Sequence, residues 1–148
     1  MKAIIVAGHI CVDIVPRLPA SAVIEPGKLI EIGPLSITLG GCVANTGGDL
    51  SHMGAPVKLC AAIGRDDLGD FVTRAFIEQE LDDTGLQIIN QKGTSYSLVF
   101  QPENADRTFW HYNGANALFD ENLVDFSKVQ ILQSGAVPRP AVTTRAGR

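Results

Sequence analysis

LGGCVANTGGDLSHMGAPVKLCAAIG, residues 39–64, contains the pattern of one helix followed directly by one strand. Small or apolar residues follow the two leading glycines at the spacing of a single helix face, and this pattern ends at Gly54. Val57–Ala62 is a short apolar run closed by Gly64, which is typical of a strand that is buried on both faces. A helix and a buried strand in succession predict an α/β fold with a mostly parallel sheet.

The flanking sequence repeats this alternation of helix and strand. Ala3–Ala7, Leu86–Ile89 and Val129–Leu132 are further apolar runs of strand length. A second helix is expected to begin at Asp66-Asp67, because carboxylates there accept bonds from free N–H groups and favour the helix dipole. We also expect a short helical segment near residues 121–126. Together these elements predict a parallel sheet that is covered on both faces.

Two other segments alternate between apolar and polar residues. Lys28–Ile32 and Leu35–Leu39 are separated by Gly33-Pro34, and residues 95–101 and 107–112 are separated by a polar turn. Alternation marks a strand with one face in water, so we predict one hairpin near 28–39 and another near 95–112. Since neither hairpin fits a sheet buried on both faces, we predict a separate small β-sheet.

Composition limits the class of protein. Of the 148 residues, 45% are hydrophobic and 19% are charged, which excludes an intrinsically disordered chain. The net charge of −4 indicates no nucleic-acid surface, and no apolar run reaches the ~20 residues of a membrane span. Cys11, Cys42 and Cys60 are widely spaced, so we expect buried free thiols rather than disulfides or a metal site. We expect a cytoplasmic protein with no nucleic-acid or membrane partner.

Polar residues and glycines near strand ends are the candidates for a binding site. Asp13 follows the first strand, and open α/β sheets bind ligands beyond the carboxyl ends of their strands. Gly40 and Gly41 let a ligand approach the backbone at a helix start, where N–H groups are free. Asn45, one turn into that helix, offers a donor and an acceptor. The alternatives are an exposed turn aspartate, a tight turn at the glycines and a solvated Asn45.

Two further clusters have a structural as well as a functional interpretation. The three carboxylates within residues 66–70 lack the spacing of a calcium loop, so we favour helix capping. The aromatic residues within 109–112, together with Arg107, either pack across strands or cover a small ligand. The sequence has no serine nucleophile elbow, no Walker loop and no Gly-x-Gly-x-x-Gly after the first strand, so hydrolase, P-loop and dehydrogenase functions lack support.

Taken together, these motifs resemble the PfkB (ribokinase-like) family of carbohydrate kinases. The match to the family's first signature comprises a glycine pair, an asparagine and a Gly-x-Asp-x-x-Gly pattern: Gly40, Gly41, Asn45, Gly64, Asp66 and Gly69. Asp13 and Gly114-Ala115-Asn116 match as well, and the resemblance extends over residues 1–135. It implies part of a ribokinase-like three-layer α/β/α sandwich with a small β-sheet lid, which the two hairpins would form.

The resemblance also implies ATP- and Mg-dependent phosphorylation of a hydroxyl group on a sugar or sugar-like molecule. In such kinases the counterpart of Asp13 binds sugar hydroxyls, the backbone of the Gly40-Gly41 pair lies against the sugar, and Asn45 makes a further polar contact. Lid residues that could also touch the sugar are Ser97, Arg107 and Phe109. Lids of this type often pair between subunits, so the resemblance is compatible with a homodimer through the β lid and leaves the oligomeric state open.

The sequence departs from this family in one respect. Family members are roughly twice as long, and their other half carries the ATP site and a Gly-Ala-Gly-Asp motif whose aspartate is the catalytic base. That motif does not occur here, so we assign no catalytic residue and expect the chain alone to be inactive. The alternative is a non-catalytic sugar-binding or dimerisation module. Residues 136–148 have no apolar period and form an atypical tail, which indicates a reading-frame change or a premature end.

Overall fold

The computed structural model describes residues 3–19, 25–102 and 106–134, so the tail at 136–148 lies outside the described residues. The strands are β1 (Ala3–Gly8), β2 (Cys11–Pro16), β3 (Leu35–Gly40), β4 (Val57–Gly64), β5 (Leu86–Ile89), β6 (Tyr96–Phe100), β7 (Thr108–Tyr112) and β8 (Val129–Ser134). The helices are α1 (Gly41–His52) and α2 (Asp67–Glu78), with short 3-10 turns η1 (Gly114–Leu118), η2 (Glu121–Leu123) and η3 (Phe126–Lys128). Within the described ranges, no helix is both long and apolar enough to cross a membrane.

The main sheet has the strand order β5-β4-β1-β8, and all its pairings are parallel. Strand β1 lies in the interior of the sheet, where Val6 pairs with Leu59 of β4 and with Gln133 of β8. An interior parallel strand has no face in water, which is why its sequence is a continuous apolar run. The predicted α/β sheet is therefore confirmed.

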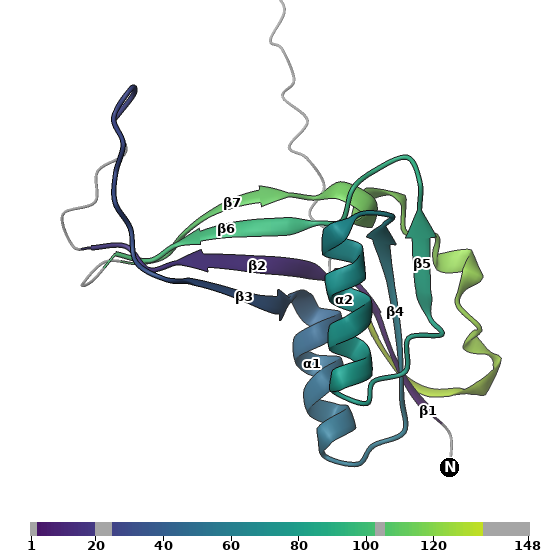
Figure 1. The fold of residues 1–148 in the computed structure, drawn as a ribbon. Coiled ribbons are helices and arrows are strands. Elements are labelled where there is room, and N and C mark those ends of the chain that lie inside the picture. The colour runs from purple at the N-terminus through teal and green to yellow at the C-terminus, as the bar shows by residue number, and fades with distance from the viewer. Residues whose placement is uncertain (1–2, 20–24, 103–105, 135–148) are drawn as a thin grey trace, which may run out of the picture.

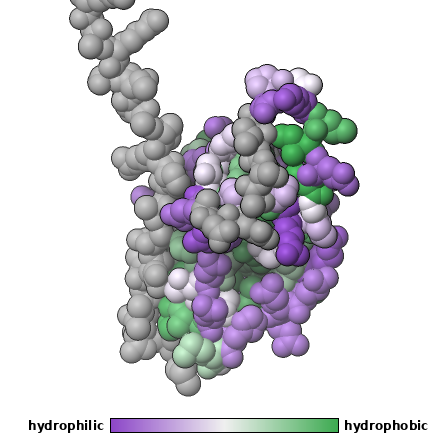
Figure 2. All heavy atoms as spheres, turned by 90° about the vertical axis from the view of Figure 1, so that its left-hand side faces the viewer, coloured by the Kyte–Doolittle hydropathy of each residue, from purple (hydrophilic) through white to green (hydrophobic). Residues whose placement is uncertain are grey.

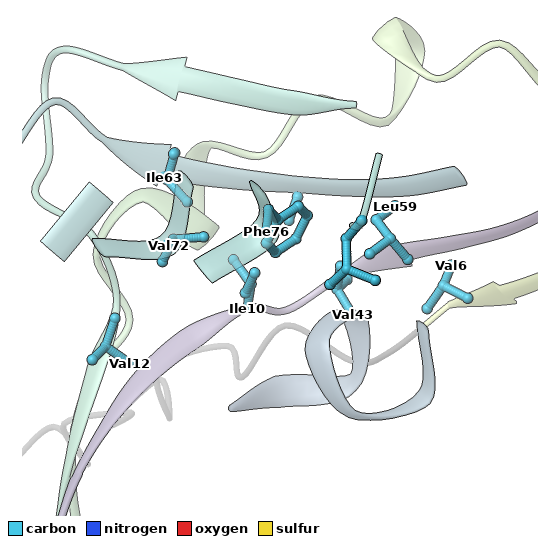
Figure 3. Packing of buried hydrophobic residues seen from close by; sticks show 10 residues of the cluster. Val6, Ile10, Val12, Val43, Leu59, Ile63, Val72 and Phe76 are labelled. Atoms are coloured by element: carbon cyan, nitrogen blue, oxygen red, sulfur yellow. The ribbon is translucent and has the colours of Figure 1, made fainter. Parts of the chain in front are cut away.

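Helices α1 and α2 lie side by side over one face of the main sheet (Figure 1). Their apolar side chains close the principal core against β1 and β4, as the close view in Figure 3 shows. The labelled core residues are Val6, Ile10, Val12, Val43, Leu59, Ile63, Val72 and Phe76, and each is at most 1% exposed. On the opposite face, Phe119 and Val124 from the η1–η3 region pack against Ile5, Ala7 and Cys60.

A second sheet, with the order β3-β2-β6-β7, extends to one side of this body (Figure 1). We call it the lid sheet. Its β6 and β7 form the antiparallel hairpin expected near 95–112. The hairpin expected near 28–39 does not form, because β3 pairs with β2 and residues 28–34 lie outside any strand.

The difference at residues 28–39 has a physical cause. Alternation identifies a half-exposed strand, but it does not identify the strand's partner. The backbone around Gly33-Pro34 continues the pairing with β2, since Gly33 N donates to Arg17 O at 2.8 Å and Arg17 N donates to Pro34 O at 3.1 Å. Gly33-Pro34 therefore extends the β2–β3 pair instead of closing a hairpin.

The structure also corrects the expected position of Asp13. The residue lies within strand β2, not in a loop beyond β1, and pairs in register with Thr38 of β3 and Ser97 of β6. Gly8, with a φ of +127°, lies where the chain leaves β1 and turns toward β2 and the lid sheet. The helical segment expected near 121–126 consists of the 3-10 turns η2 and η3, each of three residues.

Candidate functional site

The register of the lid sheet places the lid candidates on the same face as Asp13. Asp13 pairs with Ser97, and Ser97 pairs with His111, so these three residues form one row across β2, β6 and β7. Strand side chains alternate between faces, so Phe109 lies on this face two residues before His111. The Arg107 guanidinium lies over the Phe109 ring, 5.5 Å from its centroid. The polar face of the lid sheet therefore carries Asp13 together with all three lid candidates.

Gly40 and Gly41 cannot carry side chains, because the Asp13 carboxylate lies against the first and the His9 backbone against the second. A Cβ at Gly40 would overlap the Asp13 carboxylate, which lies directly against that position. Gly41 has a φ of +87°, and a Cβ there would stand 2.6 Å from the His9 carbonyl oxygen. Because Val43 N donates to the same oxygen at 3.1 Å, the start of α1 is fastened to the bend between β1 and β2.

Asn45 lies one turn into α1 with its side chain exposed. It lines a shallow hollow together with Thr38, Asp49 and His52. Because Thr38 pairs with Asp13 in the lid sheet, the hollow borders the polar face on which Asp13 lies. The structure therefore places Asn45 in a hollow that borders the face on which Asp13 lies.

Asn116 holds the bend that positions Asp13. Its side chain is 2% exposed, its Oδ1 accepts from Ile10 N at 3.3 Å, and its Nδ2 donates to Ile10 O at 2.7 Å. Both polar groups of the Ile10 backbone are thus bonded to one amide, across 106 residues of sequence. The Gly114-Ala115-Asn116 motif therefore supports the site through the backbone beside β2.

The second half of the signature has a structural role at the start of α2. Asp66 accepts from Gly69 N at 2.9 Å, from Thr94 N at 2.8 Å and from Thr94 Oγ1 at 2.6 Å. Burial alone would raise the pKa of Asp66, but these three hydrogen bonds outweigh burial and lower it. The capping expected for Asp66 is confirmed.

A hydrogen-bonded chain links Asp13 to the lid strand β7. The Cys11 thiol donates to Asp13 Oδ1 at 3.4 Å, Ser97 Oγ lies 3.9 Å from Cys11 Sγ, and Ser97 Oγ lies 3.0 Å from His111 Nδ1. The Ser97 side chain is buried, whereas His111 is exposed. From the sequence, Cys11 was expected only as a buried thiol and His111 only as a member of the 109–112 cluster, because only the strand register brings them next to Asp13.

The titration behaviour of this cluster follows from burial. Burial raises the pKa of the Cys11 thiol to about 12, and the neighbouring Asp13 carboxylate acts in the same direction. For His9, burial lowers the pKa, His111 lowers it further, and Asp13 acts in the opposite direction. The rings of His9 and His111 have centroids 5.2 Å apart. Near neutral pH, Cys11 is therefore a thiol and His9 is an uncharged imidazole.

The Asp13 carboxylate thus lies beside the start of α1 on the polar face of the lid sheet, within an α/β domain built from two sheets. The chain belongs to the pfkB family of carbohydrate kinases, whose sequence pattern matches residues 1–146.

Relatives of this family include proteins of known structure. The chain is 27% identical to ribokinase from Haemophilus influenzae over 146 residues, which is 99% of this chain and 47% of the relative. It is similar in fold to Methanocaldococcus jannaschii nucleoside kinase (TM-score 0.75, 20% identity, 90% of this chain and 44% of the other). It is also similar to Arabidopsis thaliana ribokinase complexed with ribose and ATP (TM-score 0.70, 17% identity, 77% and 36%). The chain thus spans about half the length of the curated relative, and the neighbours confirm a partial ribokinase-like fold.

The described residues do not form a binding site for the phosphates of a nucleoside triphosphate. Phosphates bind where a helix start presents free N–H groups without competing carboxylates. The start of α2 is capped by Asp66 and carries Asp67 and Asp70 in its first turn, and the start of α1 lies against Asp13. In the described ranges, no group of three or more His, Cys, Asp or Glu side chains is arranged to hold a metal ion. No step of phosphoryl transfer can therefore be assigned to these residues.

Proposed function

We propose that this chain carries the sugar-binding half of an ATP-dependent kinase that phosphorylates a hydroxyl group of a sugar or sugar-like molecule. The observation that carries the proposal is the Asp13 carboxylate, which lies against Gly40 on the polar face of the lid sheet. A carboxylate accepts hydrogen bonds from one or two hydroxyl groups, and the sugar would lie against the half-buried backbone of Gly41, next to the buried Gly40. Asn45 supplies a further polar contact, and Ser97, Arg107 and Phe109 belong to the lid above the sugar.

We further propose that the chain has no kinase activity by itself. ATP and Mg would serve the whole kinase, but the described residues do not fit either group, so no catalytic residue is assigned. We place the protein in the cytoplasm, where the free thiols Cys11, Cys42 and Cys60 stay reduced. Phosphorylation of ribose by the purified 148-residue chain, absent in Asp13→Ala, would overturn the proposed lack of activity.

Titration of the chain with D-ribose tests the proposed site. Asp13→Asn keeps the shape of the side chain but removes its charge, so we expect ribose binding to weaken about tenfold or more. Asp83→Asn is the matched control, because Asp83 is exposed in the loop before β5 and lies outside the lid sheet. Equal ribose affinities for the wild type and Asp13→Asn would rule out Asp13 as the sugar ligand.

A second candidate function is a non-catalytic sugar-binding or dimerisation module, and the lid sheet favours pairing of two copies. The lid face opposite Asp13 carries large apolar side chains that remain exposed: Leu35 (55%), Ile37 (43%), Trp110 (52%) and Tyr112 (42%). Figure 2, which views the molecule from the side on which the lid extends, shows green hydrophobic side chains at the surface beside hydrophilic ones. We propose that this apolar face forms a homodimer contact in either function.

A further inference from the structure

The carboxylate of Asp13 is the starting point for assigning a direction to the hydrogen bonds that lead from β2 to β7. An ionised carboxylate has no proton to donate, so the Cys11 thiol is the donor in the 3.4 Å contact with Asp13 Oδ1. Burial keeps the pKa of Cys11 far above neutral, so the thiol proton is present. With its proton directed at Asp13, Cys11 Sγ is left as an acceptor.

The direction continues through Ser97. When the Ser97 hydroxyl donates its one proton to Cys11 Sγ at 3.9 Å, the 3.0 Å contact with His111 Nδ1 uses a lone pair of Ser97 Oγ; the opposite direction of that contact requires the other histidine tautomer. An acceptor at that distance requires a proton on His111 Nδ1. The neutral imidazole then has a lone pair on Nε2, because only one ring nitrogen of neutral histidine carries a proton.

We propose that His111 is a specificity-determining residue for the substrate, held as the Nδ1-protonated tautomer by Asp13 through Cys11 and Ser97. Its Nε2 accepts a hydrogen bond from a substrate hydroxyl, on the same lid face on which Asp13 lies. A lone pair at this position favours a neutral polyol that has a proton to donate. It disfavours a phosphate or carboxylate group, which offers only acceptors. The role toward substrate rests on the proposed sugar-binding function, whereas the tautomer does not.

The tautomer can be measured without any ligand. In the 148-residue chain with 15N-labelled histidine, at a pH well above the usual histidine pKa of about 6.5, long-range 1H–15N correlation distinguishes the protonated ring nitrogen from the bare one. We expect the His111 signals to show a protonated Nδ1. His111→Asn identifies these signals by their loss. A protonated Nε2 on His111 in the wild type would overturn the proposed chain of hydrogen bonds.

Variants of the intervening residues test whether the chain of bonds sets the tautomer. Ser97→Ala removes the acceptor for Nδ1, and Cys11→Ala removes the group that orients Ser97. Both changes should shift the His111 signals toward the Nε2-protonated form. Cys11→Ser keeps a donor and an acceptor and should retain the wild-type pattern. Amide 1H–15N spectra show whether each variant is folded, and a folded Ser97→Ala with unchanged His111 signals would contradict the proposal.

Titration with D-ribose tests the role toward substrate. His111→Asn keeps a donor for Ser97 but lacks a group at the position of Nε2, so we expect about tenfold weaker ribose binding. Thr108→Asn, on the opposite face of the same strand, is the matched control and should bind ribose like the wild type. Equal ribose affinity of His111→Asn and the wild type would overturn the specificity role. If the wild type binds no ribose, the sugar-binding function and with it this role fail for ribose, while the tautomer spectrum still decides how His111 is held.

Discussion

The Asp13 carboxylate can adopt its position only because Gly40 has no Cβ. A Cβ at Gly40, the residue that precedes α1, would overlap the Asp13 carboxylate, whereas a Cβ at Gly48 within α1 would meet no atom within 4 Å. The two glycines are therefore constrained differently. Gly40 is required by the close approach of a side chain, and Gly48 only adds the conformational freedom that weakens a helix.

We expect alanine at Gly40 to weaken ligand binding and alanine at Gly48 to stabilise the fold. Gly40→Ala should displace the Asp13 carboxylate and weaken D-ribose binding about tenfold or more, as measured by titration calorimetry. Gly48→Ala should raise the free energy of unfolding by about 1 kcal/mol, as measured by urea denaturation, because alanine is the better helix former. Ribose binding by Gly40→Ala at the wild-type affinity would show that the carboxylate position does not matter for binding.

At the scale of elements, the start of α2 shows how one side chain joins three segments. Asp66 caps the helix through Gly69 and also binds Thr94, whose Oγ1 accepts from Gly64 N at the end of β4. The signature residues Gly64, Asp66 and Gly69 therefore fix α2 against the main sheet and the approach to β6. The contribution that these contacts make is to the stability of the fold.

Asp66→Ala should lower the free energy of unfolding by about 1–2 kcal/mol at neutral pH, since it removes a helix cap. The folded pKa of Asp66 is depressed, so its stabilisation is complete above the unfolded value of about 3.9 and is lost as pH falls through the lower folded value. The difference between wild type and variant should therefore narrow in acid. Urea denaturation at several pH values measures it, and a difference that does not change with pH would contradict this assignment.

The local sequence pattern was sufficient to predict those helices and strands whose buried face is visible as an apolar pattern within a single segment. The apolar runs of β1 and β4 and the helical stripes of α1 and α2 were predicted, because each buries a face that can be seen within one segment. Strand β2 was not predicted, because it begins at Cys11, directly after the end of β1 at Gly8, and no turn signal separates a second strand there. The partner of β3 was not predicted either, since pairing depends on a segment far away in sequence.

The same limit applies to the residues of the candidate site. Asp13, Gly40 and Asn45 could be selected from the sequence because they belong to a recognisable spacing. Cys11 and His111 could not, because their contacts depend on the register of β2, β6 and β7, and Ser97 lies 86 positions from Cys11. Hydrogen bonds between side chains on three strands far apart in sequence produce no periodic pattern from which they could be predicted.

At the scale of the whole molecule, the lid sheet separates two kinds of surface. One face is polar around Asp13, and the other carries exposed large apolar residues such as Ile37 and Trp110. A sheet with one apolar face is stable in water when that face is covered, and a second copy presents an identical apolar face. The lid could thus bind ligand on one side and pair on the other.

Sedimentation analysis checks this arrangement. Ile37→Lys combined with Trp110→Lys should shift the protein from dimer to monomer, because two charges on each copy would have to be buried in the contact. Leu123→Lys is the matched control, because Leu123 is an exposed apolar residue of η2 outside the lid sheet, and it should leave the dimer intact. A wild-type chain that sediments as a monomer at all concentrations would disprove the lid contact.

The amide of Asn116 also has a consequence for the order in which the molecule is assembled. It bonds both backbone groups of Ile10, which entered the growing polypeptide 106 positions earlier. A nascent chain on the ribosome can therefore form α1 and its neighbouring strand long before the bend next to Asp13 is locked. Contacts between residues this far apart in sequence slow folding, so we expect the bend next to Asp13 to form late.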